Sequence, residues 1–293
     1  PRILPPDQMQ PSAEPPTLAP PPEPSGRRLP SPARSRSAGA AHAVVDALLG
    51  RGPSVGSNNW VVHGSRTDSG APLLSNDPHL GVRVPSTWFL NGIDAPGLRV
   101  VGASFPGLPG VVIGHNEHVA WGLTNSPMDV QDLYRERLDE AGMALQREGA
   151  WEPLERRTET IRVRGAGAVT LEVDASSLGP FVGAFYPGYD EPVALRWTAL
   201  DPGDTTIAAM FGLMRSGSAL EAEEALRGFT VPSQNVVFAD VQGHIGWKAP
   251  GRIPRRGAFD GRRAGRGWVA ADRWQGWIPF EELPGAVDPL QGY

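Results

Sequence analysis

Short runs of apolar and β-branched residues recur along most of the chain, and Gly, Pro, Asn or Asp separates one run from the next. Runs of this kind with turn-forming boundaries are typical of β-strands. The pattern therefore predicts strands in six ranges, which are 59–62, 72–75, 88–91, 100–103, 111–113 and 119–123.

Two later pairs of runs predict β-hairpins, because a short segment that contains glycine joins the members of each pair. The first pair is 159–163 with 169–173. The second pair is 235–241 with 244–247.

Helix-forming residues dominate three ranges, 38–49, 205–215 and 219–227. Gly50 follows the first range as an expected C-cap, and Ser218 precedes the third as an expected N-cap. Strands outnumber these helices, and no repeat of fixed period is visible. The sequence therefore predicts an α+β fold class.

Proline is concentrated at the start of the chain, where 12 of the 31 prolines fall within residues 1–32. Residues 1–37 are therefore expected to be a disordered, extended segment rich in proline and arginine. Residues 38–56 are expected to form a helix followed by a linker, which together act as a spacer. The remaining residues, 57–293, have the composition of a folded body.

The charge balance and the absence of cysteine exclude several classes of protein. The net charge of −5 leaves no dominant basic surface, so nucleic acid is not an expected partner. The absence of cysteine excludes disulfide scaffolds, zinc-finger sites and thiol nucleophiles. No apolar stretch is long enough to predict a membrane span, and no signal peptide is visible in the sequence.

Ser57, which follows Gly56 at the head of a predicted strand, has a candidate chemical role. If the Gly56–Ser57 bond were cleaved, Ser57 would carry a free α-amine beside its own hydroxyl. The pKa of an α-amine is roughly 7.7–8.0, so this amine is able to accept a proton near neutral pH. One residue would then supply both the nucleophile and the base, without a histidine partner.

Five sequence blocks around and after Ser57 occur in a fixed order. They are Gly56-Ser57-Asn58-Asn59-Trp60, Ser75-Asn76-Asp77-Pro78-His79-Leu80, Gly114-His115-Asn116 with Ala120-Trp121-Gly122-Leu123-Thr124-Asn125, Asn235 with Phe238-Ala239-Asp240-Val241, and Asp288-Pro289-Leu290-Gln291-Gly292-Tyr293. In this order the blocks resemble the penicillin acylase family of N-terminal nucleophile hydrolases. That family includes acyl-homoserine lactone, aculeacin and cephalosporin acylases, and the resemblance covers residues 57–293.

The resemblance implies the four-layer αββα sandwich of this superfamily, present here as an incomplete fragment. Residues 57–293 would be the N-terminal part of an acylase β-chain. The resemblance also implies a precursor that cleaves itself between Gly56 and Ser57, so that the spacer 38–56 ends at the cleavage site. An acylase α-chain, which this sequence does not contain, is then an expected partner.

Five residues match catalytic positions of the family. Ser57 would be the nucleophile, His79 would contact it, and Arg256 would hold the active-site residues in position without contacting the substrate. The backbone amide of Asn125 and the side chain of Asn235 would stabilise the oxyanion. The residues alone leave other interpretations open: His79 as a structural histidine, Asn235 as a turn residue and Arg256 as part of a solvated basic loop.

Further positions imply a substrate pocket and a metal site. Leu80, Val112 and Ile113 match positions that line the acyl pocket, although a place in the ordinary core fits them equally well. Asp129 and Asp132 match carboxylates that bind calcium in some members, and hard cations favour such oxygen ligands. No organic cofactor is expected.

The implied function is an amidohydrolase that cleaves the acyl-amide bond of an N-acylated small molecule through an acyl-serine intermediate. The expected substrate classes are a β-lactam, an acyl-homoserine lactone and a lipopeptide. The resemblance also implies a periplasmic or secreted protein without a membrane partner. The alternative that stays open is an inactive fragment, or a β-rich binding module, derived from such an enzyme.

Overall fold

The computed structural model describes residues 56–80, 84–183 and 191–293. The predicted segment 1–37 and the predicted helix 38–49 lie outside the described residues. The helices are α2 (Thr206–Arg215) and α3 (Ala219–Ala225). The strands are β1 (Gly56–Val62), β2 (Leu73–His79), β3 (Phe89–Ala95), β4 (Leu98–Ser104), β5 (Ile113–His115), β6 (Val119–Asn125), β7 (Gln131–Arg135), β8 (Ala144–Arg147), β9 (Ala150–Pro153), β10 (Glu155–Ile161), β11 (Val169–Ser176), β12 (Gly179–Pro180), β13 (Val193–Trp197), β14 (Gln234–Asp240), β15 (Ile245–Lys248), β16 (Pro254–Arg256), β17 (Gly265–Arg266), β18 (Trp274–Trp277) and β19 (Gly285–Val287).

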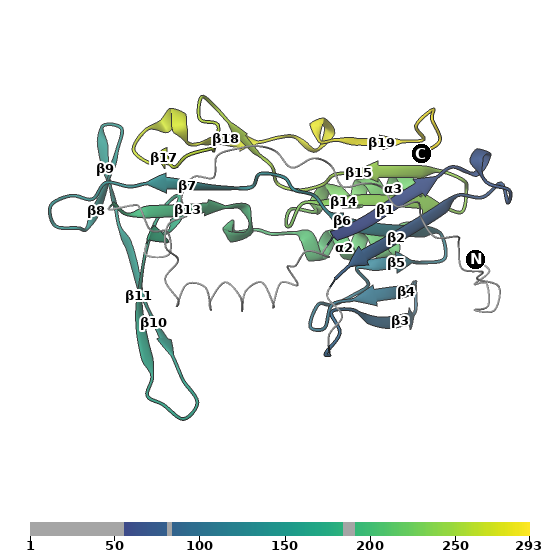
Figure 1. The fold of residues 1–293 in the computed structure, drawn as a ribbon, viewed down its shortest axis with the longest axis horizontal. Coiled ribbons are helices and arrows are strands. Elements are labelled where there is room, and N and C mark those ends of the chain that lie inside the picture. The colour runs from purple at the N-terminus through teal and green to yellow at the C-terminus, as the bar shows by residue number, and fades with distance from the viewer. Residues whose placement is uncertain (1–55, 81–83, 184–190) are drawn as a thin grey trace, which may run out of the picture. The chain divides into compact units, whose positions relative to one another are not determined.

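The largest element is a seven-stranded antiparallel sheet in the order β19-β15-β14-β6-β5-β4-β3 (Figure 1). The helices α2 and α3 pack against one face of this sheet. Val236 and Phe238 of β14 are fully buried in one cluster with Leu213 and Met214 of α2. This helix-covered face is the main hydrophobic core.

The hairpin of β1 and β2 covers the opposite face of the large sheet. Val237, which lies between Val236 and Phe238 along β14, is buried in a second cluster with Val61 of β1 and Ile245 of β15. Successive residues of a strand point to opposite faces, so the two clusters lie on opposite sides of the sheet. The described residues therefore form two β layers and one helical layer, which confirms the predicted α+β class.

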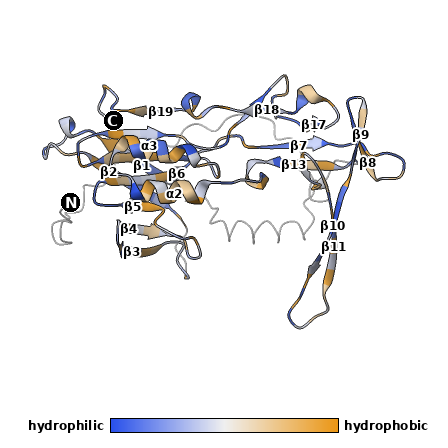
Figure 2. Cartoon of the chain, turned by 180° about the vertical axis from the view of Figure 1, so that it is seen from behind, coloured by the Kyte–Doolittle hydropathy of each residue, from blue (hydrophilic) through white to orange (hydrophobic). Residues whose placement is uncertain are grey.

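A second region is built on the three-stranded sheet β13-β7-β17. Tyr134 of β7 is fully buried there with Leu178 and Ala194, and its hydroxyl donates a 3.1 Å hydrogen bond to the carbonyl of Asp272. Burial raises the pKa of the Tyr134 phenol. By contrast, every residue of β10 is exposed, and Figure 2 shows hydrophilic and hydrophobic residues mixed along β10 and β11.

Most of the predicted elements are confirmed. Both predicted hairpins form, as β10 with β11 and β14 with β15. The predicted helix 219–227 begins at Ala219, and the Ser218 side chain caps it by accepting the amide of Glu221 at 3.2 Å. No helix among the residues that the structure describes is long and apolar enough to cross a lipid bilayer.

The predicted strand over 111–113 is displaced along the chain, because the observed strand covers Ile113–His115. Val111 and Val112 precede this strand, β5, as irregular, buried residues of the core beneath α2. The sequence pattern also fails to predict β7 and β13. The inward positions of β7 include Asp132, a charged residue whose burial hydrophobic patterning does not reveal.

The chain after β19 is held to β15 by a histidine–carboxylate pair. His244 Nδ1 lies 2.7 Å from Asp288 Oδ2, and Asp288 Oδ1 accepts the amide of Ile245 at 3.0 Å. The hydrogen bond that His244 donates to the Asp288 carboxylate raises the pKa of His244, and the charges of Asp288 and Asp240 act in the same direction. Burial acts to raise the pKa of Asp288, but the hydrogen bonds from the Ile245 amide and from His244 hold this pKa below its usual value.

We expect Asp288→Asn to lower the pKa of His244 toward its ordinary value, because the carboxylate that most favours the charged imidazole is removed. Because folding raises the pKa of His244, the pairing with Asp288 stabilises the fold in full below the pKa that His244 has in the unfolded chain. This stabilisation is lost as pH rises through the folded pKa. NMR titration of the imidazole and thermal unfolding against pH test this, with the exposed Asp68→Asn as control. An unchanged His244 titration in Asp288→Asn contradicts the assignment.

Candidate active site

Ser57 is the second residue of β1, and its hydroxyl is hydrogen-bonded to the preceding peptide. The pairing of β1 with β2 places Gly56 opposite His79 and Ser57 opposite Pro78. Ser57 Oγ donates a 2.6 Å hydrogen bond to the carbonyl oxygen of Gly56. Strand alternation puts Ser57 on the same face of β1 as the buried Val61, which is the face that packs on the large sheet.

His79, at the end of β2, lies beside Gly56. A Cβ atom added to Gly56 would be 3.9 Å from His79 Nδ1. The other ring nitrogen, Nε2, is 2.7 Å from Asp77 Oδ2, and 43% of the His79 side chain is exposed. The carboxylate therefore orients the imidazole with Nδ1 toward the chain just before Ser57. Asp77 lies in the same sequence block as His79, but nothing in the local pattern assigns it a role.

Asn125 and Asn235 meet at one end of the β6–β14 pair, where Gln234 is opposite Asn125 and Asn235 is opposite Thr124. Asn235 Nδ2 donates to the carbonyl of Asn125 at 3.4 Å. The side chain of Asn125 is occupied separately, because its Oδ1 accepts a 2.9 Å hydrogen bond from Gln234 Nε2. The two asparagines therefore lie in one cluster, and their oxyanion role stays a prediction.

Asn59 connects β1, the strand that carries Ser57, to this asparagine cluster. Its Nδ2 donates to the carbonyl of Asn235 at 3.0 Å and approaches the carbonyl of Gly122 at 3.5 Å. Asn59 and Ser57 are two residues apart on one face of β1, a spacing of roughly 6.6–6.8 Å. This contact gives Ser57 a defined position relative to Asn125 and Asn235. Asn59 received no role from the sequence, because nothing in its local pattern distinguishes it from a turn-forming asparagine.

Arg256 lies in a different cluster. Its Nε donates to Asp132 Oδ2 at 2.8 Å, and its Nη2 is 3.1 Å from Asp129 Oδ1. The Asp132 side chain is fully buried, and Trp274 Nε1 donates to the same Oδ2 atom. In the described part of the chain, Arg256 forms no hydrogen bond with Ser57 or Asn235. The guanidinium therefore joins β16 to β7, and its predicted support of the nucleophile stays a prediction.

Calcium at Asp129 and Asp132 likewise stays a prediction. Calcium takes about six to eight oxygen ligands, whereas the described residues contain no group of three or more acidic or histidine side chains suited to a metal. The guanidinium of Arg256 already binds both carboxylates. The side chains present therefore do not make a calcium site by themselves, and no chemical step is assigned to calcium below.

Of the three predicted pocket residues, Val112 and Ile113 belong to or pack against the core, and Leu80 is part of no core cluster among the described residues. Val112 is buried in the cluster beneath α2, and Ile113 packs against that cluster. The carbonyl of Val112 also accepts a 3.0 Å hydrogen bond from Trp121 Nε1. Leu80 is half-buried directly after β2. The positions of Val112 and Ile113 agree with the ordinary-core interpretation, and the acyl-pocket role of all three residues stays a prediction.

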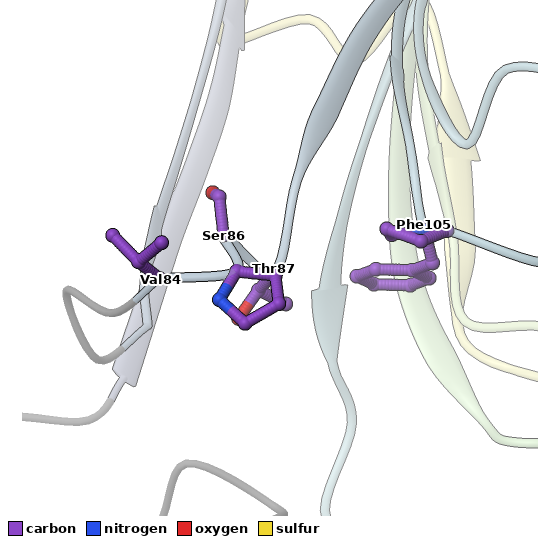
Figure 3. Close-up of a pocket in the computed structure, with 6 residues that line it drawn as sticks. Val84, Ser86, Thr87 and Phe105 are labelled. Carbon is purple, nitrogen blue, oxygen red and sulfur yellow. The ribbon is translucent and has the colours of Figure 1, made fainter.

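A separate surface hollow of about 460 Å³ lies between the segment that precedes β3 and the segment that follows β4 (Figure 3). It is lined by Val84, Pro85, Ser86, Thr87, Phe105 and Pro106. None of the predicted pocket residues is part of its lining. The hollow therefore gives no support to the proposed acyl pocket.

The arrangement of strands and helices resembles that of a solved N-terminal nucleophile hydrolase. The thermostable penicillin G acylase of Alcaligenes faecalis matches with a TM-score of 0.72 and 27% sequence identity. The match covers 80% of this chain and 42% of that one. It confirms the predicted fold class.

A family model described as penicillin amidase matches residues 4–293, and the chain belongs to this family. The acyl-homoserine lactone acylase QuiP of Pseudomonas aeruginosa is 33% identical over 249 residues, covering 81% of this chain and 29% of that protein. The penicillin acylase 2 proenzyme of Pseudomonas sp. (strain SE83) is 31% identical over 238 residues, covering 81% and 31% respectively. The chain thus spans less than a third of the length of these curated relatives.

The close packing of the β1–β2 hairpin against β6 requires a glycine at position 122. A Cβ atom at Gly122 would lie 2.7 Å from the Cβ of Asn76 in β2. We expect Gly122→Ala to lower the free energy of unfolding by about 1–3 kcal/mol, because the hairpin must move outward. Chemical denaturation measures the loss. Gly167→Ala, where an added Cβ meets nothing within 4 Å, should change stability little, and equal effects of the two substitutions would contradict this packing.

Proposed function

We propose that the chain carries the nucleophile and the oxyanion donors of an acylase that hydrolyses the amide bond of an N-acylated small molecule. The observation that carries the proposal is the 2.6 Å hydrogen bond from Ser57 Oγ to the Gly56 carbonyl. It lies on a strand that Asn59 ties to the backbone of Asn235. The names of the relatives favour an acyl-homoserine lactone or a penicillin-type β-lactam as substrate, with a lipopeptide as the third candidate.

Maturation comes first in the proposed sequence. Ser57 Oγ attacks the carbonyl carbon of Gly56, the Gly56–Ser57 amide bond breaks, and the chain before Ser57 is held as an ester on Oγ. The nitrogen of Ser57 gains the proton lost from the hydroxyl and becomes a free α-amine. Water then hydrolyses the ester. His79, with Nδ1 beside Gly56, is placed to exchange protons during these steps.

Turnover uses the released amine as the base. With a pKa of roughly 7.7–8.0, the amine accepts the Ser57 hydroxyl proton as Oγ attacks the substrate carbonyl. Asn235 Nδ2 and the Asn125 amide stabilise the oxyanion. The amine product leaves with a proton, and water hydrolyses the acyl-Ser57 ester to release the acid and restore the hydroxyl.

The proposal includes partners and a location. The proenzyme named among the relatives supports a processed protein in which an acylase α-chain accompanies the β-chain. We extend to this chain the periplasmic or secreted location that the resemblance implies. No organic cofactor enters the proposed reaction, and calcium at Asp129 and Asp132 would require ligands beyond these two carboxylates.

The nucleophile is tested by substituting Ser57. Ser57→Ala should abolish both cleavage and turnover, because the attacking oxygen is absent, whereas Ser57→Cys should retain some cleavage through its thiol. Intact mass and N-terminal sequencing report cleavage through a new terminus that begins Ser57-Asn58-Asn59-Trp60. Turnover is followed with penicillin G and an acyl-homoserine lactone, and Ser69→Ala is the control. Turnover by Ser57→Ala would falsify the mechanism, and a wild type that is neither cut nor active would favour the inactive fragment or binding module.

The oxyanion donors are tested by comparing two asparagines. Asn235→Ala should lower turnover by about 10²–10³-fold, which corresponds to roughly 2.7–4 kcal/mol, because the side chain is the donor. Asn125→Ala should have an effect below about tenfold, because its backbone amide remains and only the contact with Gln234 is lost. Steady-state kinetics on the same substrates measure both. Equal losses in the two variants would contradict the assigned donors.

A further inference from the structure

The carboxamide of Asn76 in β2 joins three strands. Its Nδ2 donates one hydrogen bond to the carbonyl of Asn58 in β1 and another to the carbonyl of Leu123 in β6, each at 3.1 Å. Its Oδ1 accepts the amide of Leu123 at 2.9 Å. Both amide protons and the oxygen of the side chain are therefore used.

The hydrogen bonds from Asn76 to Leu123 replace those that a neighbouring strand would make to this part of β6. The pairing of β5 with β6 covers Ala120 and Trp121 and does not extend to Leu123 within the described residues. In an antiparallel ladder, a hydrogen-bonded residue exchanges two bonds with its partner, one through its amide and one through its carbonyl. The Asn76 side chain makes both of these bonds to the backbone of Leu123. The close approach is possible because the preceding residue, Gly122, has no Cβ.

These bonds connect the two halves of the candidate site. Asn58 directly follows Ser57, and Leu123 lies two residues before Asn125 on the same edge and face of β6. Asn59 adds a second, independent connection, from β1 to the carbonyl of Asn235 on β14. The nucleophile strand is therefore bonded to each of the two strands that carry an oxyanion donor.

We propose that Asn76 is a positioning residue that sets the distance between Ser57 Oγ and the oxyanion donors. The proposal rests on the function proposed above for Ser57. Asn76 touches neither the reacting atoms nor the substrate, and it acts through the backbones of Asn58 and Leu123. A displacement of about 1 Å between reacting groups costs about 10²-fold in rate, so loss of this connection should be measurable.

The test compares Asn76→Ala and Asn76→Asp with Asn91→Ala in the full chain. Asp keeps an acceptor for the Leu123 amide and loses both donated bonds. Asn91 is a matched control, because its Nδ2 makes a 2.7 Å cross-strand bond to Ser104 Oγ on β3 and β4, outside the site. Amide hydrogen exchange reports the Leu123–Asn125 backbone. Labelling by phenylmethylsulfonyl fluoride, which bonds sulfur to Ser57 Oγ as fluoride leaves, reports the site.

We expect Asn76→Ala to speed exchange at Leu123 at least about tenfold. Its maximal labelling rate should fall about 10²-fold, while the reagent concentration at half-maximal rate stays within about twofold. Asn76→Asp should slow labelling with Leu123 still protected. If Asn76→Ala fails to fold, Asn76→Asp alone decides. Labelling equal to that of Asn91→Ala, or unchanged Leu123 exchange in Asn76→Ala, overturns the proposal. If wild-type Ser57 is never labelled, the proposed function fails instead, and Leu123 exchange still decides whether Asn76 holds β6.

Discussion

Hydrogen bonds between the two β layers set the position of the β1–β2 hairpin, and the candidate site depends on that position. Apolar contacts such as that of Val61 with Val237 favour burial but have no preferred direction. The carboxamides of Asn59 and Asn76 add bonds of defined length and angle to the backbones beneath them. Ser57 and the candidate oxyanion donors Asn125 and Asn235 lie on three different strands, so the distances between them depend on how the hairpin sits on the large sheet.

The region around β7 follows a different principle, because its interior is charged. Arg256 bridges Asp132 and Asp129, and the Arg147 guanidinium contacts the fully buried carboxylate of Glu136 at 2.7 Å. Removing one member of such a pair leaves a buried charge without a partner, which is far more costly than losing an exposed ion pair. Arg256 is therefore part of the architecture of this region whatever it contributes to chemistry.

The sequence predicts the hairpins and helices well where hydrophobic patterning decides burial, as in 235–241 and 219–227. It fails at β7, where Asp132 and Tyr134 face inward and the Asp132 Oδ2 and Tyr134 hydroxyl bond to partners distant in sequence. The candidate site follows the same division. Ser57 and Asn235 are identifiable from local blocks, whereas the contacts of Asn76 and Asn59 reach strands 47 and 176 residues away. Such contacts exist only after the layers pack.

If the chain is cleaved at the proposed Gly56–Ser57 bond, the strand that then begins at Ser57 keeps nearly all of its pairing with β2. Cutting between Gly56 and Ser57 removes only the Gly56–His79 pair from the β1–β2 ladder, which continues from Ser57 to Val62. The bonds to the large sheet begin at Asn58 and Asn59, beyond the cut. The new α-amine would therefore gain the freedom to act as a base, while the residues that hold the hydroxyl in place keep every bond they have in the uncut chain.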